Sequence, residues 1–338
     1  MSLPIHRRVE EMGPVDARQF DAEIRTRAEP VVIRGAVRDW PAVAAGRESD
    51  EALVDYLKRM DQGKRAEVLV GPPEIDGHFF YDAAMSGCNF QKRYGSLSGL
   101  LDKILSLRSE ERPIALYAGA AGVDEHLAGW AGQNRLPFEL PDATPRIWIG
   151  NRTRVATHFD ETSNVAVVVS GQRRFTLFPP EQLDNLYVGP LHFTIAGPPV
   201  SMVDLENPDF ERYPKFADAL PHGLIADLEP GDALFIPPIW WHSVKALGRF
   251  NILVNYWWGE RHAVSPLAAL THAILAVRDL PPAQRAAWRK WFEHYVFDEA
   301  APHAGDHLPE AARGVVGPPS DEKIKAFSDY LAGTLSAP

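Results

Sequence analysis

The chain has little cysteine, no long hydrophobic run and no excess of basic residues, and each absence excludes a class of protein. Its single cysteine, Cys88, cannot form an intrachain disulfide, which fits a reducing compartment such as the cytoplasm. No hydrophobic run approaches the roughly 20 residues that span a bilayer. Residues 1–14 are polar and charged and lack the hydrophobic stretch of a secretory signal. We therefore expect a cytoplasmic protein with no membrane partner.

Basic residues are outnumbered, with 35 Lys and Arg against 45 Asp and Glu, and the formal net charge is −10. Broad binding to nucleic acid needs a basic surface, so we do not expect a nucleic-acid partner. The polar runs at residues 91–93 and 172–174 are too short to form such a surface. The hydrophobic fraction of 45% and the charged fraction of 24% are those of an ordinary globular protein.

Turn-forming residues are frequent, with 29 prolines and 25 glycines scattered along the chain. They indicate many turns between short elements. Before residue 146, hydrophobic periodicity predicts helices and strands in mixture. The helices are expected at 15–27, 50–58 (with Asp50 as N-cap) and 96–107, and the strands at 30–35, 67–70 and 114–118.

From residue 146 the pattern changes to short strands separated by Gly, Pro, Asn and Asp. Their spacing is typical of a β-sandwich or barrel, so we expect a mainly β fold with helical additions. The strands are expected at 147–149, 153–160, 165–169, 173–178, 201–204, 222–227, 233–236, 241–245 and 250–257.

After residue 259 the pattern becomes helical again. Trp288, Trp291 and Tyr295 recur there at helical spacing, and they either pack on the β core or form a subunit interface. Helices are expected at 266–277, after the proline pair 281–282, and at 321–335.

Three residues, His158, Asp160 and His242, have the pattern of a metal site. His158 and Asp160 open a strand-like segment, and alternate residues of a strand project from one face about 6–7 Å apart. By the same alternation, Asn164 should face the same cavity. His242 lies on a second hydrophobic strand that follows a Pro-Gly turn. Two imidazoles and one carboxylate on one side of a metal leave its other positions open, as in non-haem Fe(II) oxygenases.

Four segments of the chain together resemble the JmjC/cupin-like Fe(II)- and 2-oxoglutarate-dependent oxygenases. They read THFDETSN at 157–164, GQRRFTLFPP at 171–180, GDALFIPPIWWH at 231–242 and NYW at 255–257. The resemblance implies a double-stranded β-helix, the jelly-roll fold of cupins, preceded by N-terminal α/β elements and followed by C-terminal helices. It also implies Fe(II) held by His158, Asp160 and His242, with 2-oxoglutarate and dioxygen as its partners.

The resemblance further implies which residues bind the co-substrate. Arg173 stands where the family usually has a lysine that holds the far carboxylate of 2-oxoglutarate, and Tyr117 and Asn255 match residues near the co-substrate. Val155 stands where the family has a threonine that helps to bind the same carboxylate. Arginine binds carboxylates through a fork of N–H donors. Arg173 therefore either takes over the task of the lysine or changes the identity of the co-substrate.

By this resemblance the chain is a dioxygenase that hydroxylates an unactivated C–H bond, on a protein or peptide side chain or on a small molecule. Two alternatives stay open: a metal-binding cupin without oxygenase activity, and an N-demethylase that uses the same centre. The resemblance implies a catalytic domain over residues 1–260, with its β-helix core at about 113–260. The C-terminal helices of relatives form dimers, so residues 261–338 are expected to form a helical dimerisation element of a homodimer.

Overall fold

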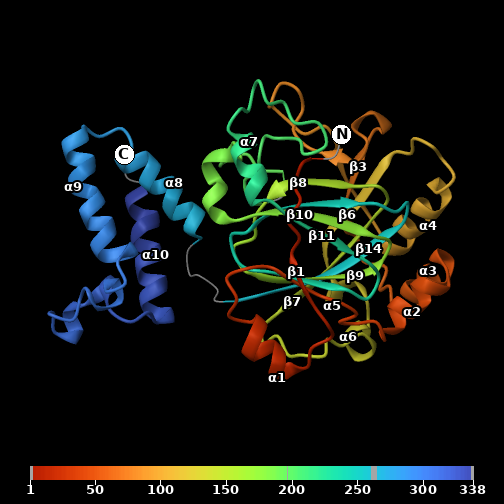
Figure 1. Ribbon diagram of the computed structural model, residues 1–338. Helices are drawn as coiled ribbons and strands as arrows, with labels where there is room; N and C mark the ends of the chain where they lie inside the picture. The colour runs from red at the N-terminus through yellow and green to blue at the C-terminus, as the bar shows by residue number, and fades with distance from the viewer. Residues whose placement is uncertain (1–2, 196, 260–264, 336–338) are drawn as a thin grey trace. The chain divides into compact units, whose positions relative to one another are not determined.

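The computed structural model describes residues 3–195, 197–259 and 265–335 (Figure 1). The chain divides into two compact units, Met1–Gly259 and Glu260–Pro338. Among the described residues, no helix has both the length and the hydrophobicity needed to cross a membrane.

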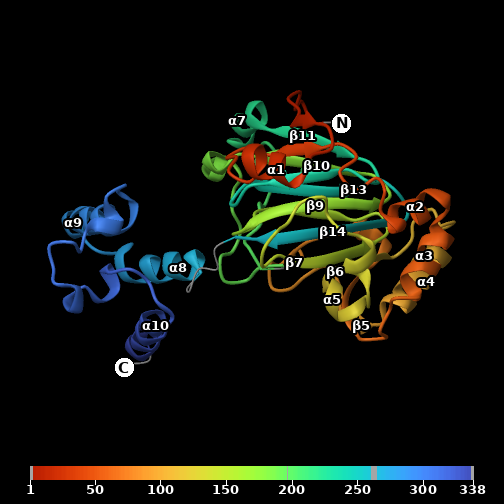
Figure 2. The same cartoon turned by 90° about the horizontal axis from the view of Figure 1, so that it is seen from below.

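The first unit is built on two β-sheets that pack against each other (Figures 1 and 2). The larger sheet has the strand order β1 (Glu10–Met12), β2 (Val31–Ile33), β12 (Ala233–Ile236), β9 (Ser163–Ser170), β14 (Asn251–Trp258), β7 (Thr144–Gly150), β6 (Ala115–Gly122), β3 (Ala66–Gly71) and β5 (Gln91–Gly95). The smaller sheet has the order β11 (Leu224–Leu228), β10 (Arg173–Phe178), β13 (Trp241–Ala246), β8 (Arg154–His158) and β4 (His78–Phe79). This arrangement confirms the predicted jelly-roll core with helical additions.

Strand β9 shows how the sequence produces the two layers. Its side chains alternate between the faces of the sheet, as they must in a strand. Val165, Val167 and Val169 pack with the helices outside the larger sheet. Ala166 and Val168 face the smaller sheet and pack with its hydrophobic residues. A strand that is covered on both faces reads as a continuous hydrophobic run, which is why this segment contains so many valines.

Three helices cover the outer face of the larger sheet: α2 (Pro41–Glu48), α3 (Asp50–Lys58) and α4 (Leu97–Leu107) (Figure 2). Helix α4 begins where the Ser96 hydroxyl accepts a hydrogen bond from the Gly99 N–H, and its leucines recur at the spacing that places them on one buried stripe. The other helices of this unit are short: α1 (Ala17–Gln19), α5 (Val123–His126), α6 (Trp130–Gln133) and α7 (Phe216–Ala219). Brief 3-10 or π turns lie at Phe20–Ile24, Pro73–Ile75, Pro180–Asn185 and Leu220–His222.

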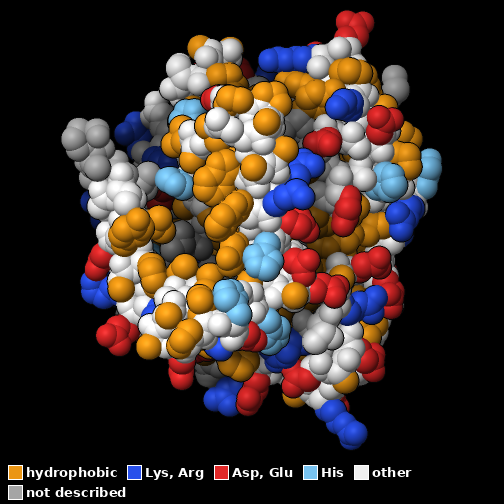
Figure 3. Space-filling model, turned by 90° about the vertical axis from the view of Figure 1, so that its left-hand side faces the viewer, with side chains coloured by type: hydrophobic (Ala, Val, Ile, Leu, Met, Phe, Trp, Pro, Cys, Tyr) orange, Lys and Arg blue, Asp and Glu red, His pale blue; other side chains and the backbone are white. Residues whose placement is uncertain are grey.

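The second unit is helical, with α8 (Pro266–Val277), α9 (Pro282–Phe292) and α10 (Asp321–Leu335). Brief 3-10 or π turns lie between α9 and α10, at Glu293–Phe297, Ala301–His303, Glu310–Ala312 and Gly314–Val316. Trp291 stacks on Tyr295, with ring centroids 5.6 Å apart, and contacts Trp288 in a tilted arrangement at 6.0 Å. Trp288, Trp291 and Tyr295 remain exposed, at 46%, 58% and 38%. In the space-filling view of Figure 3, hydrophobic side chains gather in patches among charged ones.

Some local predictions were wrong. Residues 201–204 form no strand, only an isolated bridge between Val188 and Ser201. The expected helix at 15–27 is reduced to α1 and one π turn. Helix α3 is capped by Ser49, whose hydroxyl accepts from the Ala52 N–H at 3.0 Å, so Asp50 lies inside the first turn.

Candidate metal centre

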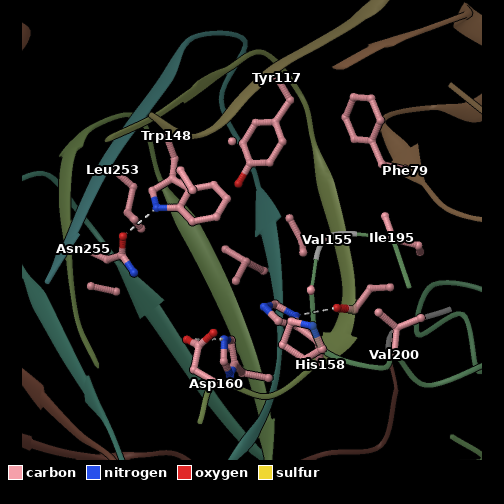
Figure 4. Close-up of a pocket in the computed structure, with 18 of the residues that line it drawn as sticks. Phe79, Tyr117, Trp148, Val155, His158, Asp160, Ile195, Val200, Leu253 and Asn255 are labelled. Carbon is pink, nitrogen blue, oxygen red and sulfur yellow. Dashed lines mark hydrogen bonds and ion pairs between the residues drawn. The ribbon is translucent and has the colours of Figure 1, made fainter. Parts of the chain in front are cut away.

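A cavity of about 540 Å³ opens between the two sheets of the first unit (Figure 4). Both sheets contribute to its wall, and so does the loop that precedes Val200. All seven residues predicted to form the site line this one cavity: Tyr117, His158, Asp160, Asn164, Arg173, His242 and Asn255.

The three candidate metal ligands converge at one end of this cavity. His158 is the last residue of β8 and lies directly opposite His242 in β13, because the two strands pair antiparallel in that register. One possible ligand atom from each of His158, Asp160 and His242 lies within 4.8 Å of the other two. The closest approach between ligand types is 3.7 Å, from His242 Nε2 to Asp160 Oδ2. The arrangement can hold one metal ion from one side.

Strand alternation was predicted to place Asp160 beside His158, but Asp160 lies in a loop. Strand β8 ends at His158, so Asp160 lies beyond it and strand alternation does not orient its side chain. The Asp160 carbonyl instead accepts a hydrogen bond from the Ile239 N–H at 2.8 Å, which ties the loop to the turn before β13. Ile239 has φ of 66°, a left-handed conformation that β-branched residues rarely adopt. Such strain tends to lie at functional sites.

Both imidazoles present the nitrogen that a metal needs. His158 Nδ1 lies 2.9 Å from the Ala156 carbonyl, and His242 Nδ1 lies 2.9 Å from the Trp240 carbonyl. A carbonyl only accepts hydrogen bonds, so each Nδ1 carries the proton and each Nε2 keeps its lone pair. Burial, together with the neighbouring His158, lowers the pKa of His242 to about 4, although Asp160 opposes the shift. The lowered pKa favours a neutral imidazole at His242.

The carboxylate of Asp160 is held by two N–H donors that both bind Oδ2. Asn164 Nδ2 and Trp257 Nε1 each donate to this oxygen at 3.0 Å. This is also the carboxylate oxygen that lies 3.7 Å from His242 Nε2. Two further hydrogen bonds extend this network away from the carboxylate. Asn255 Nδ2 donates to Asn164 Oδ1 at 3.3 Å, and Trp148 Nε1 donates to Asn255 Oδ1 at 2.7 Å. Figure 4 shows Asn255 turned toward Trp148.

Sequence reasoning missed the two tryptophans of this network. Neither Trp257 nor Trp148 was predicted to bind a candidate metal ligand or its partners. A signal for Trp257 existed, because it follows Asn255 by two residues on one strand and therefore shares its face. No local signal identifies Trp148, whose bond to Asn255 depends on the pairing of β7 with β14.

Arg173 is a buried cation with unused hydrogen-bond donors. Its side chain is 1% exposed, and its Nε and Nη2 have no partner among the described residues. These two nitrogens form one edge of the guanidinium, the fork that fits a carboxylate. The hydroxyl of Tyr117 points into the same cavity (Figure 4). Burial raises the pKa of Tyr117, although the charge of Arg173 opposes the shift.

Arg173 faces the cavity, and the next residue on its strand faces away from it. Arg174 points to the other face of β10 and pairs with Asp227 at 2.6 Å. Val155 lines the cavity and offers no polar atom from its side chain. The cavity therefore has a cationic fork in Arg173 and candidate metal ligands in His158, Asp160 and His242.

Comparisons with known proteins agree with this description. A family model described as "Cupin-like domain" matches residues 17–263. HSPB1-associated protein 1 of Bos taurus is 26% identical over 253 residues, which cover 68% of this chain and 48% of that protein. Lysine-specific demethylase JMJ31 of Arabidopsis thaliana is 35% identical over 271 residues, or 73% of this chain and 49% of that protein. tRNA wybutosine-synthesizing protein 5 of Danio rerio is 38% identical over 109 residues, or 32% and 30%. The chain thus spans about half the length of the first two relatives.

Proposed function

The chain belongs to the cupin-like, JmjC-type domain family, and from this premise we propose that it is an Fe(II)- and 2-oxoglutarate-dependent dioxygenase that hydroxylates an unactivated C–H bond. The observation that carries the proposal is the unpaired guanidinium edge of Arg173. It lies in the same cavity as the three candidate ligands His158, Asp160 and His242.

The donor set fits Fe(II). Two imidazole nitrogens and one carboxylate oxygen on one side of the metal are the ligands of non-haem Fe(II) oxygenases. Fe(II) bound there supplies oxidation by dioxygen, in which R–H, O₂ and 2-oxoglutarate give R–OH, succinate and CO₂. The residues of this chain hold the ligands in place, bind the co-substrate and exclude competing reactions.

The opposite side of the cavity fits the far carboxylate of 2-oxoglutarate. Arg173 offers two parallel N–H donors, whereas the lysine usual in the family would offer a point charge. The second donor offsets the loss of the hydroxyl that Val155 cannot supply. The Tyr117 hydroxyl can donate a further hydrogen bond. Asn164 and Asn255 each keep one N–H that the network ending at Asp160 does not use.

For the prime substrate we propose a side chain of a protein or peptide, with small molecules as the alternative. One relative is named a lysine-specific demethylase and another a tRNA wybutosine-synthesizing protein. Hydroxylation of an N-methyl carbon releases formaldehyde, whereas hydroxylation of a carbon without nitrogen leaves a stable alcohol. Detection of formaldehyde with a substrate would therefore reassign the chain to the N-demethylases.

The test is co-substrate binding followed by turnover. Adding 2-oxoglutarate to the protein loaded anaerobically with Fe(II) should produce a metal-to-ligand charge-transfer absorption band, and admitting air should produce succinate. A protein that binds Fe(II) yet shows neither the band nor succinate would be a metal-binding cupin without oxygenase activity.

We further propose that the helical unit mediates a homodimer. Its support is the exposed aromatic cluster of Trp288, Trp291 and Tyr295, whose rings contact one another. Exposed hydrophobic patches of this kind mark interaction surfaces. Light scattering should give the mass of a dimer for the full chain and of a monomer for Trp291→Asp. A monomeric full chain at micromolar concentration contradicts the proposal.

A further inference from the structure

We propose that strand β5 is a docking edge for the peptide substrate, whose acidic, extended segment pairs with β5 as an added strand. The inference rests on the proposed function in one respect, namely that the docked peptide is also the substrate. The docked segment acts as an anchor, and the residue that reacts lies elsewhere in the same polypeptide.

The outer edge of β5 pairs with no other strand of the structure that is described. The strand is the last in the order of the larger sheet, and its one partner is β3. Its residues from Gln91 to Tyr94 are exposed, so no other described element covers them. Within the described ranges, no backbone–backbone hydrogen bond joins Gln91–Gly95 to any segment besides β3. An extended peptide can pair with such an edge through its main chain.

The fold gathers four basic residues at this edge. The register of the two strands brings Lys64 and Arg65, which precede β3, beside the end of β5, which carries Lys92 and Arg93. Of these four, only Lys92 forms an ion pair with a described residue, Glu67, at 3.1 Å. At physiological ionic strength charges interact over only about 8 Å. The patch therefore attracts an acidic segment although the net charge of the chain is −10.

Protection against aggregation is the alternative role of these charges, because lysine and arginine often guard exposed strand edges. Strand β1, at the other end of the strand order, shows how the charges of an edge are compensated within the chain. Its Glu10 and Glu11 are paired with Arg27 and Arg34. Most of the cations at β5 lack such a partner among the described residues, which favours an acidic partner from outside.

The docking edge is continuous with the cavity that contains the candidate metal ligands. In the register of the sheet, Leu69 of β3 lies between Tyr117 of β6 and Lys92 of β5, and all three residues line the cavity. Neighbouring strands lie about 4.8 Å apart, so a strand added outside β5 would run about 14 Å from β6. No side chain reaches that far, which is why the docked segment anchors the substrate and a different residue of it enters the cavity.

Single-stranded RNA is the competing partner for a basic edge. Its affinity depends on the number of phosphates that are neutralised, and one of the four cations at β5 already has an acidic partner. RNA also has no backbone N–H groups that could continue a β-sheet, whereas a peptide gains main-chain hydrogen bonds. The edge therefore favours a peptide, and RNA is tested beside it.

The experiment measures binding to the full-length protein without metal by fluorescence anisotropy, so that the result does not depend on turnover. The probe is a labelled peptide of alternating glutamate and valine, and a peptide of alternating lysine and valine should bind more weakly. Two further versions of the acidic probe carry N-methyl groups, one on every glutamate amide and the other on every valine amide. Strand pairing uses only one of these two sets of amides, so one version should lose binding and the other should keep it.

Charge reversal tests the same edge from the side of the protein. Arg93→Glu should raise the Kd of the acidic probe about fivefold or more, because a repulsion replaces an attraction. Lys64→Glu should act in the same direction, and it replaces the first variant if that protein folds poorly. Arg18→Glu is the matched control, because Arg18 is exposed in α1, which follows β1 and lies away from β5 (Figure 2). This control should leave the Kd unchanged.

Equal affinity for the acidic probe and both of its N-methylated versions would overturn strand pairing, and so would an unchanged Kd in Arg93→Glu. Binding of an oligouridylate that Arg93→Glu weakens, without binding of the acidic peptide, would assign the edge to RNA and overturn the inference. A protein that binds the probe as expected but forms no succinate from 2-oxoglutarate would overturn the proposed function and leave the docking edge in place. A protein that forms succinate but does not bind the probe would overturn this inference alone.

Discussion

Replacing Arg173 with methionine should stabilise the protein while it removes the co-substrate. The Arg173 guanidinium is 1% exposed and leaves two N–H donors without partners among the described residues. Burying a charge without a counter-ion costs free energy in the apo protein, and that cost disappears with the charge. Replacement of buried ionic groups by hydrophobic residues of similar volume ranges from neutral to a gain of about 1–4 kcal/mol. We expect the free energy of unfolding of Arg173→Met to rise by about 2 kcal/mol.

The effect on binding has the opposite sign. Hydrogen bonds to charged groups contribute about 1.5–3 kcal/mol each, and the Arg173 fork can make two of them with a carboxylate. A loss of about 3–4 kcal/mol corresponds to a Kd for 2-oxoglutarate that is at least about 100-fold higher. Urea unfolding of the apo protein measures the first effect, and calorimetric titration with 2-oxoglutarate measures the second.

Arg174→Met is the matched control, because it makes the same chemical change one residue along the same strand. Arg174 faces outward, its side chain is 42% exposed, and it pairs with Asp227. Its loss should cost at most about 1 kcal/mol and leave 2-oxoglutarate binding unchanged. The reasoning fails if Arg173→Met is no more stable than the wild type and binds 2-oxoglutarate as tightly.

Two further predictions concern stability. Gly171→Ala should lower the free energy of unfolding by about 3 kcal/mol or more, because φ is +75° and the new Cβ would lie 2.2 Å from Asn251 Oδ1. Gly63→Ala is the control, since Gly63 has φ of +68° but lies in open space, and this change should cost only about 1–2 kcal/mol. Equal losses in urea unfolding would contradict the steric account. The hydrogen bond from Arg174 holds the pKa of Asp227 below its ordinary value, although partial burial opposes the shift. Asp227 therefore adds stability to the folded protein. This contribution is complete above the unfolded-state pKa of about 3.9, and it is lost as the pH falls through the lowered folded-state pKa. Asp227→Asn should therefore be less stable than the wild type at about pH 6 and approach it at about pH 3, and a difference independent of pH would contradict this.

Elements with a strong hydrophobic period were predicted closely, and those without one were missed. The strands β10 and β12 and the helices α8 and α10 have the predicted bounds. Strand β5 was missed because it lies at the edge of its sheet and four of its five residues, Gln91 to Tyr94, are exposed. With neither face buried, its side chains show no alternation for a sequence pattern to reveal.

The candidate site was predictable where one strand, or the resemblance to a family, supplied the position. Alternation along β10 is enough to place Arg173 inside and Arg174 outside. For Asp160 the alternation argument was wrong even though the residue lies in the cavity, since β8 ends before it. The bonds that Trp148 and Trp257 make could not be predicted, because they join the strands β7 and β14 to each other and to the loop after β8, and only the folded protein defines how these segments meet.

Residues whose burial or backbone conformation destabilises the fold identify the site more directly than residues that stabilise it. The guanidinium of Arg173 is buried without a counter-ion, and Ile239 holds a left-handed backbone next to the candidate ligands. Each lowers the stability of the apo protein. Such unfavourable features concentrate at functional sites, where the binding of a ligand offsets the lost stability. An anion beside Arg173 would offset that loss, which is why stability and co-substrate binding should move in opposite directions when this arginine is replaced.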